Sequence, residues 1–266
     1  MSLRALLASP LGFLVGLSLG ALGGGGSILA VPALVFAAGQ DPRDATASSL
    51  LLVGVAALIG LGPHLRAGRV RVGTGLAFGA AGIGGSLAGS ALNRRIDPDL
   101  LLLAFAGLVA VAAWRMLTGC PTCTRVGEER SVRAGGVTVR TPIDARRVVA
   151  VLGAGTGVGF LTGLFGVDGG FVIVPALTLL LHLSMPAAIG TSLLVITINS
   201  AVALAARATT TSIDWAVTIP FAVAAIGGVL AGGRVADRLD PERSLRWFAG
   251  LLVAVAAYTA IDALTG

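Results

Sequence analysis

Lysine is absent from this chain, and charged residues of any kind are scarce. All 19 basic residues are arginine, and charged side chains make up 12% of the 266 residues. An ordinary soluble domain is about one quarter charged, so the scarcity argues against a soluble globular protein. The net charge of +6 does not indicate nucleic-acid binding. The arginines lie mostly in connections between apolar segments, where positive charge sets membrane orientation.

Cysteine and histidine are also rare, with two residues of each. Cys120-Pro-Thr-Cys123 supplies only half of a tetrahedral zinc set. It is therefore read as plain linker, as a redox or disulfide pair, or as a metal site shared with a second chain. No other metal or cofactor motif is present, and no cofactor is expected.

Long apolar runs replace the missing charge. Hydrophobic residues make up 55% of the chain. A membrane-spanning helix needs about 20 predominantly apolar residues. The charge-free stretches that approach this length are 11–40, 45–65, 72–93, 100–114, 148–167, 169–206, 215–233 and 247–261. They predict an all-α polytopic membrane protein, here assigned to the bacterial cytoplasmic membrane with the lipid bilayer as its partner.

One glycine-rich motif occurs twice, at a separation of 143 residues. The first copy runs over 16–34 and the second over 159–177, and each interrupts a long apolar stretch. Further matches keep the same offset, such as Ile83-Gly-Gly85 with Ile226-Gly-Gly228. A register kept over about 100 residues indicates two copies of one structural unit. The recurrence also argues that the N-terminal stretch is a retained span and not a cleaved signal peptide.

The chain is thus predicted to form a first transmembrane repeat over 1–117, a soluble linker over 118–147 and a second repeat over 148–266. Each repeat has four apolar segments, of which the first is broken by glycine. A broken segment that crosses the membrane makes the repeats parallel, whereas one that folds back as a re-entrant hairpin inverts the second repeat. The arginines of loop 64–71 favour eight segments with the N-terminus inside, and the choice between parallel and inverted repeats stays open.

The glycine clusters are candidate substrate-binding sites. Helix packing explains glycines at four-residue spacing, but it does not explain a cluster. A cluster that breaks a helix frees backbone N–H groups at the start of the next half-helix, where they and the helix dipole favour an anion. The candidate residues are Gly23, Gly25, Gly26, Ser27, Gly166, Gly169 and Gly170.

Paired hydroxyl residues follow each cluster by one segment. Ser48 and Ser49 in the first repeat correspond to Thr191 and Ser192 in the second. Such hydroxyls either bond a carbonyl of their own helix or face a cavity and donate to an oxyanion. Asn199, farther along the same predicted helix, is a further candidate for lining the site.

Asp168 is the only acidic residue well inside an apolar stretch, and its equivalent in the first repeat is Gly25. An intramembrane carboxylate is a functional candidate by default. Asp168 is expected to carry a proton coupled to transport. The alternative is that it caps the half-helix that begins at Gly169.

His64 and Arg207 occupy equivalent positions at the end of the second segment of each repeat. Either they extend to the membrane interface as amphipathic side chains do, or they attract an anion at the mouth of a cavity.

An enzyme is not expected. Gly25-Gly-Ser27 with a distant histidine is reminiscent of a serine hydrolase, but Ser27 is replaced by Gly170 in the other repeat and neither histidine lies in a motif.

The duplicated Gly-x-x-x-Gly-x-x-Gly-x-Gly-Gly motif before Val-Pro-Ala-Leu, followed by the hydroxyl pair, resembles the sulfite exporter TauE/SafE family. The resemblance covers nearly the whole chain except the 118–147 linker. It implies an integral inner-membrane protein with seven or eight spans that exports sulfite or organosulfur anions such as sulfoacetate. Val167 and Asp168 depart from the glycines of the first copy. The matching residues are Gly23, Gly25, Gly26, Pro32, Ser48, Ser49, Gly166, Gly169, Gly170, Pro175, Thr191 and Ser192.

The predicted function is therefore export of a small anion, sulfite or an organosulfonate, with proton coupling through Asp168. The alternatives are a passive anion channel, an importer, and a membrane redox sensor that uses Cys120 and Cys123. A homodimer is a further option that the sequence leaves open.

Overall fold

The structure is a computed structural model. It describes residues 3–24, 26, 30–31, 33–37, 39–40, 42–93, 96, 98–118, 145–165, 170–207, 214–238, 246–250, 252–254 and 256–257. Within these ranges the chain forms helices and connections and no strand. Five of the helices are long and apolar enough to cross a membrane, by length and composition. The predicted class, an all-α polytopic membrane protein, is confirmed.

The elements follow one another along the chain as α1 (Leu3–Leu22), η1 (Ala33–Ala37), α3 (Pro42–Arg66), α4 (Val72–Asn93), α5 (Pro98–Thr118), α7 (Ala145–Phe165), α8 (Gly170–Pro175), η2 (Ala176–Leu180), α9 (Met185–Arg207) and α10 (Trp215–Arg238). The described parts of 246–257 form a last helix. Proline begins α3 and α5, at a helical position where its missing N–H removes no hydrogen bond.

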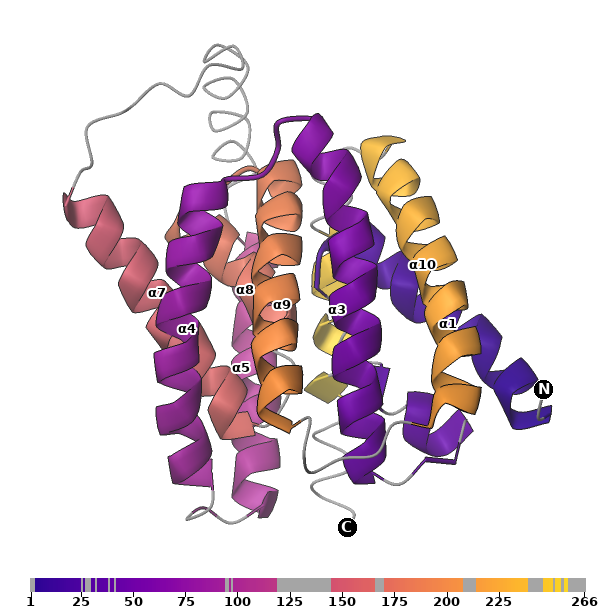
Figure 1. The fold of residues 1–266 in the computed structure, drawn as a ribbon. Coiled ribbons are helices and arrows are strands. Elements are labelled where there is room, and N and C mark those ends of the chain that lie inside the picture. The colour runs from indigo at the N-terminus through magenta and orange to yellow at the C-terminus, as the bar shows by residue number, and fades with distance from the viewer. Residues whose placement is uncertain are drawn as a thin grey trace.

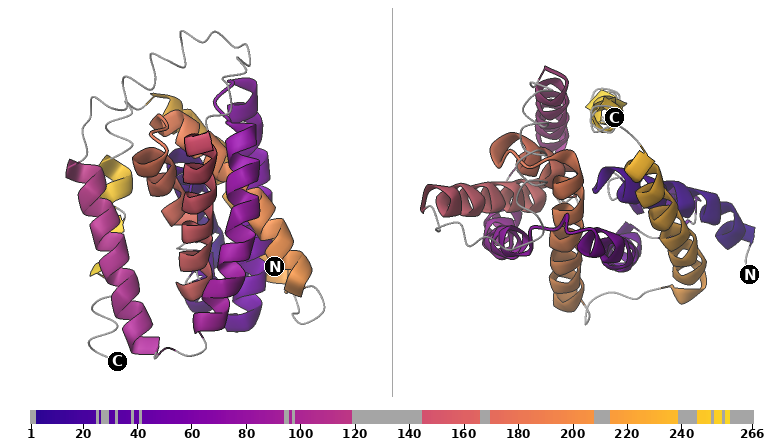
Figure 2. Two further views of the ribbon diagram at one scale, coloured as in Figure 1. Left: turned by 90° about the vertical axis from the view of Figure 1, so that its left-hand side faces the viewer. Right: turned by 90° about the horizontal axis from the view of Figure 1, so that it is seen from above.

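Glycines allow two pairs of helices to approach each other closely. In the first pair, a Cβ added to Gly16 of α1 would lie 2.0 Å from the Ala225 carbonyl oxygen of α10. In the second pair, a Cβ added to Gly159 of α7 would lie 2.0 Å from the Gly82 carbonyl oxygen of α4. Small residues let transmembrane helices approach in this way. Each pair joins a helix of the first half of the chain to a helix of the second half (Figures 1 and 2).

The two pairs correspond contact by contact. The offset of the sequence repeat relates the two sets of contacts. For a contact between α1 and α10, the α1 residue number plus 143 and the α10 residue number minus 143 give the residues of a contact between α7 and α4. The approaches of α1 to α10 join Gly12 to Phe221, Gly16 to Ala225, Gly20 to Val229, Phe13 to Gly228 and Leu17 to Gly232. Their counterparts between α7 and α4 join Gly155 to Phe78, Gly159 to Gly82, Gly163 to Ser86, Thr156 to Gly85 and Phe160 to Gly89. Within each pair the residue numbers rise together, so the paired helices are parallel.

The helices α3 and α9 lie between these pairs (Figure 2, right) and run antiparallel. Near the middle of α3, Gly54 lies against Ser200, and near its end His64 lies against Gly190. Residue numbers therefore fall along α9 as they rise along α3. Because α3 is parallel to α10, with Gly60 against Val229, the helices α1, α3 and α10 share one direction. Gly75 of α4 lies against Thr191 and Leu194 of α9, and Gly79 lies against residues farther along α9, so α4 and α9 are parallel. The helices α4, α7 and α9 therefore share the opposite direction.

The broken first segment turns back on itself. Gly26 lies against Val15 and Leu19 of α1, with an added Cβ only 2.1 Å from the Val15 carbonyl oxygen. Since α1 and α3 are parallel, the chain must also return between Leu22 and Pro42 to begin α3 at the end where α1 began.

Candidate functional site

The two glycine breaks lie against each other in the interior. A Cβ added to Gly24 would lie 1.9 Å from the carbonyl oxygen of Gly170, so only glycine lets the two backbones touch. Both residues are buried. The contact joins the end of α1 to the start of α8 and brings together residues 146 positions apart in the chain. Gly24 lies inside the glycine run that the sequence singled out, although it was not one of the candidate residues.

Gly23 ends α1 and forms the contact with α9. Its φ of 74° is left-handed, and its N–H donates to the Leu19 carbonyl at 2.8 Å, which is a common way for glycine to end a helix. An added Cβ would lie 2.7 Å from the Ile189 Cα and 2.8 Å from the Ser192 Oγ. Gly23 is therefore required both by its backbone conformation and by the space available to it.

The Ser192 hydroxyl links α9 to the first break. It lies within hydrogen-bonding distance of the Gly23 carbonyl oxygen and, at 2.8 Å, of the Ile189 carbonyl oxygen. Its single hydrogen donates to one of these acceptors at a time. Ser49 makes the equivalent local bond in the other half, donating to the Thr46 carbonyl at 2.8 Å. Ser49 therefore bonds to a carbonyl of its own helix, which is one of the two roles expected for these hydroxyls. Ser192 can do the same or bond to the Gly23 carbonyl.

The other two predicted hydroxyls contact neighbouring elements. Thr218 of α10 donates to the Ser48 Oγ at 3.3 Å, and the Arg71 backbone N–H donates to the Thr191 Oγ1 at 3.1 Å. Ser48, Ser49, Thr191 and Ser192 are all fully buried. In this conformation the hydroxyls are thus enclosed by protein and hold α3, α9 and α10 together.

Asn199 lies elsewhere. It is seven residues beyond Ser192 on α9, about two helical turns away. Its Oδ1 atom is buried without a hydrogen bond to any described residue, and it would lie 3.8 Å from a Cβ added to Gly79 of α4. The structure therefore does not bring Asn199 to the glycine contact.

Several predicted site residues lie outside the described residues. They are Gly25, Ser27, Gly166, Asp168 and Gly169, together with Cys120 and Cys123 of the linker. Among the residues that the structure describes, no three His, Cys, Asp or Glu side chains gather as metal ligands.

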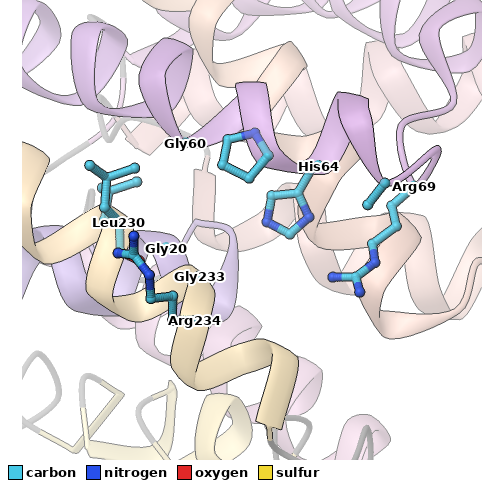
Figure 3. Close-up of a pocket in the computed structure, with 10 residues that line it drawn as sticks. Gly20, Gly60, His64, Arg69, Leu230, Gly233 and Arg234 are labelled. Carbon is cyan, nitrogen blue, oxygen red and sulfur yellow. The ribbon is translucent and has the colours of Figure 1, made fainter.

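A cavity of about 190 Å³ opens between α1, α3 and α10 (Figure 3). Among the described residues that line it, His64, Arg69 and Arg234 are ionisable and none is acidic. His64 is buried, Arg69 is half-buried and Arg234 is exposed. The other lining residues are Gly20, Gly60, Pro63, Ala67, Val229, Leu230 and Gly233.

Sequence reasoning missed Thr218 and the two cavity arginines. Thr218 corresponds to Gly75 in the first repeat, so the repeat carried no signal for a hydroxyl there. Arg69 and Arg234 lie in different halves and look like ordinary interfacial charges until α3 and α10 are placed side by side. His64, one of the two equivalent residues for which the sequence left two readings, lines this cavity.

Comparison with known proteins agrees with this architecture. A family model described as "Sulfite exporter TauE/SafE" matches residues 8–259. A probable membrane transporter protein of Xylella fastidiosa strain Temecula1 is 34% identical over 250 residues, covering 93% of this chain and 91% of the relative. The probable membrane transporter protein YdhB of Bacillus subtilis is 29% identical over 184 residues, covering 69% of this chain and 71% of the relative. No solved structure matches the chain.

Proposed function

Because the chain belongs to the TauE/SafE sulfite exporter family, we propose that it is a secondary transporter that exports a small anion, sulfite or an organosulfonate, across the cytoplasmic membrane. Family membership and the apolar helices identify a multi-pass membrane transporter. The substrate, the direction and the coupling are proposals. The observation that carries them is the contact of the two glycine breaks, Gly24 against Gly170, beside the Ser192 hydroxyl.

In this proposal the anion binds where the two breaks meet. Backbone N–H groups of the two glycine clusters and the hydroxyls of Thr191 and Ser192 would donate to its oxygens. Ser48 and Ser49 lie toward the other end of α9, past the contact of Gly54 with Ser200, so they are out of reach of the same small anion. For Ser192 this requires exchange of its present hydrogen bond to a carbonyl for a bond to the anion. A net protein hydrogen bond contributes only about 1 kcal/mol, so a charged acceptor competes well. The closed centre also favours a transporter over a passive channel, which needs a continuous open path.

We further infer that the two halves form an inverted repeat. The equivalent helices α1 and α7, α3 and α9, and α4 and α10 run in opposite directions, and their contacts exchange with the 143-residue offset. Inverted repeats with broken helices at their interface are typical of secondary transporters that work by alternating access. If each half took up the conformation that the other half now has, the glycine contact would become accessible from the other side of the membrane.

The arginines orient this arrangement in the membrane. The face that holds the α3–α4 turn carries nine arginines in the described residues, against three at the opposite face. The first set is Arg66, Arg69, Arg71, Arg115, Arg146, Arg147, Arg234, Arg238 and Arg246, and the second is Arg4, Arg43 and Arg207. Positive charge favours the cytoplasmic side. Since α1 starts at the opposite face, this orientation places its start outside and replaces the expectation of an N-terminus inside.

The cysteines of the chain test the orientation. Cys120 and Cys123 lie between α5 and α7, whose facing ends are at the arginine-rich face. A membrane-impermeant maleimide should leave them unlabelled in intact cells and label them in inside-out vesicles. In a Cys120→Ser, Cys123→Ser background, Asp214→Cys at the start of α10 should show the reverse pattern. Labelling of the native cysteines from outside would refute the orientation.

Reconstituted protein tests the function. Proteoliposomes should transport sulfite or a short organosulfonate faster than protein-free liposomes, and an opposing pH gradient should change the rate. The purified protein should also gain thermal stability from the transported anion, because a ligand that binds only the folded state raises its apparent stability. Absence of transport for sulfite, sulfate, thiosulfate, taurine and sulfoacetate would reject the substrate class.

In the same assay Asp168→Asn tests the proposed coupling. The amide cannot carry a proton but keeps the shape of the side chain, so the pH gradient should lose its effect while the anion still stabilises the protein. A variant that responds to the gradient as the wild type does would exclude Asp168 as the coupling residue and leave the capping role.

A further inference from the structure

We propose that the cavity between α1, α3 and α10 is an anion-binding vestibule, in which Arg69, Arg234 and His64 collect the transported anion at the arginine-rich face. This inference rests on the proposed function and adds to it a second binding position with its own residues. The vestibule would hold the anion before the anion reaches the contact between Gly24 and Gly170.

The chemistry of the lining selects an oxyanion. Arginine is always charged and presents planar N–H donors that match two oxygens on one centre. Arg69 enters from the turn after α3 and Arg234 from the last turns of α10, while the His64 ring lies between the two helices (Figure 3). No described residue of the lining carries a negative charge. Bonds from arginine to an oxyanion are charge-assisted and stronger than neutral hydrogen bonds.

The size of the cavity limits the anion. Its volume of about 190 Å³ is below the range of about 300–1,000 Å³ found for pockets that hold drug-sized ligands. Gly20, Gly60 and Gly233 line it, and a Cβ added to Gly233 would still meet no atom within 4 Å. The vestibule therefore fits an inorganic sulfur oxyanion or a short organosulfonate, and it is too small for a nucleotide.

The cavity adjoins the predicted substrate site. A Cβ added to Gly190 would lie 3.1 Å from the His64 Cβ, and Gly190 directly precedes Thr191 on α9. On another side, Gly20 lies one turn before Gly23 on α1. The lining of the vestibule is thus close in the chain or in space to Thr191 on α9 and to Gly23 at the end of α1.

Unlike His64, whose equivalent is Arg207, the two cavity arginines have no charged equivalent in the other repeat. The positions equivalent to Arg69 and Arg234 are Ser212 and Ala91. Where α10 has Gly233 and Ala236, α4 has Ser90 and Asn93. These two side chains donate to the Gly163 and Leu164 carbonyls of α7, at 3.4 Å and 2.6 Å. In this conformation a cavity lies beside α1 and α10, whereas two hydrogen bonds join α4 to α7 at the equivalent positions.

Charge removal is the first test. In proteoliposomes Arg234→Gln should raise the KM for sulfite about tenfold, because a charge-assisted bond to the anion is lost, while the maximal rate stays near that of the wild type. Arg69→Gln should act in the same direction. Arg66→Gln is the matched control, because it removes the same charge from the same face at an exposed residue outside the cavity lining.

Filling the cavity is the second test. Gly233 lines the cavity, and an added Cβ there meets no atom within 4 Å, so Gly233→Leu should occupy the vestibule without a clash. It should abolish the thermal stabilisation of the purified protein by sulfate and sulfite and slow transport. Gly84→Leu on α4 is the control, since Gly84 is also in open space but lies outside the cavity.

The binding measurement separates this inference from the proposed function. Stabilisation of the wild type by sulfate or sulfite that is lost in Gly233→Leu and weakened in Arg234→Gln supports the vestibule, even if no transport is observed. Transport without these effects supports the function and overturns the vestibule. Failure of every tested anion to stabilise the wild type also overturns it.

Discussion

Gly23→Ala is expected to lower the rate of sulfite transport in proteoliposomes by about tenfold or more. The methyl group would lie 2.7 Å from the Ile189 Cα and 2.8 Å from the Ser192 Oγ, so α1 and α9 would have to separate. A left-handed non-glycine residue adds about 1–2 kcal/mol of strain, and overpacking adds about 1–3 kcal/mol. The measurement is the initial rate per amount of protein that elutes as a folded species in size-exclusion chromatography.

Gly68→Ala separates strain from crowding. Gly68 has a φ of 66°, close to the 74° of Gly23, but an added Cβ there meets nothing within 4 Å. Alanine at this turn should carry the same left-handed strain, and transport should stay near the wild-type rate. Equal loss of transport in both variants would mean that backbone strain alone explains the effect. Normal transport by Gly23→Ala would remove the Gly23–Ser192 contact from the proposed site.

Gly159→Ala is expected to cause a large loss of stability. The added methyl group would lie 2.0 Å from the carbonyl oxygen of Gly82 and 2.5 Å from its Cα, and backbone atoms cannot move aside as a flexible side chain does. Overpacking of this kind costs about 1–3 kcal/mol or more. The thermal unfolding midpoint of the detergent-purified protein should fall by several degrees, since each kcal/mol shifts a chain of this size by about 2–4 °C.

Gly157→Ala in the same helix provides the control, because its added methyl group meets nothing within 4 Å. Alanine is a better helix former than glycine by about 0.5–1 kcal/mol, so this variant should keep or slightly raise the midpoint. Gly16→Ala should reproduce the loss seen for Gly159→Ala, because Gly16 lies equally close to the Ala225 carbonyl oxygen of α10. Equal midpoints for Gly157→Ala and Gly159→Ala would contradict the close packing of α4 and α7.

The repeat explains why the helix breaks could be predicted from the sequence. The 143-residue offset that relates the two motifs in the sequence also relates the helix contacts, down to the pairs of Gly16 with Ala225 and Gly159 with Gly82. It even extends to a connection, where His182 adopts a φ of 52° at the position equivalent to Gly39 with a φ of 68°. Glycine clusters break helices for local reasons, so the breaks could be placed from sequence. Among the described candidates, Asn199, chosen because it shares a helix with Ser192, lies about two helical turns beyond Ser192 and away from the contact.

The sequence by itself determined the class of protein, the repeat and the position of each break, because these depend on composition and on the local conformational preferences of glycine and proline. The tertiary structure decided which helices pair, and it joined α1 to α10 and α4 to α7 across the two halves. In a bilayer any apolar helix with small residues is able to pack against another, so pairing leaves no local signature. The same holds for the vestibule, where Arg69 and Arg234 line one cavity only because α3 and α10 are neighbours. The return of the first segment, and with it the opposite directions of the halves, follows from contacts between residues far apart in the chain.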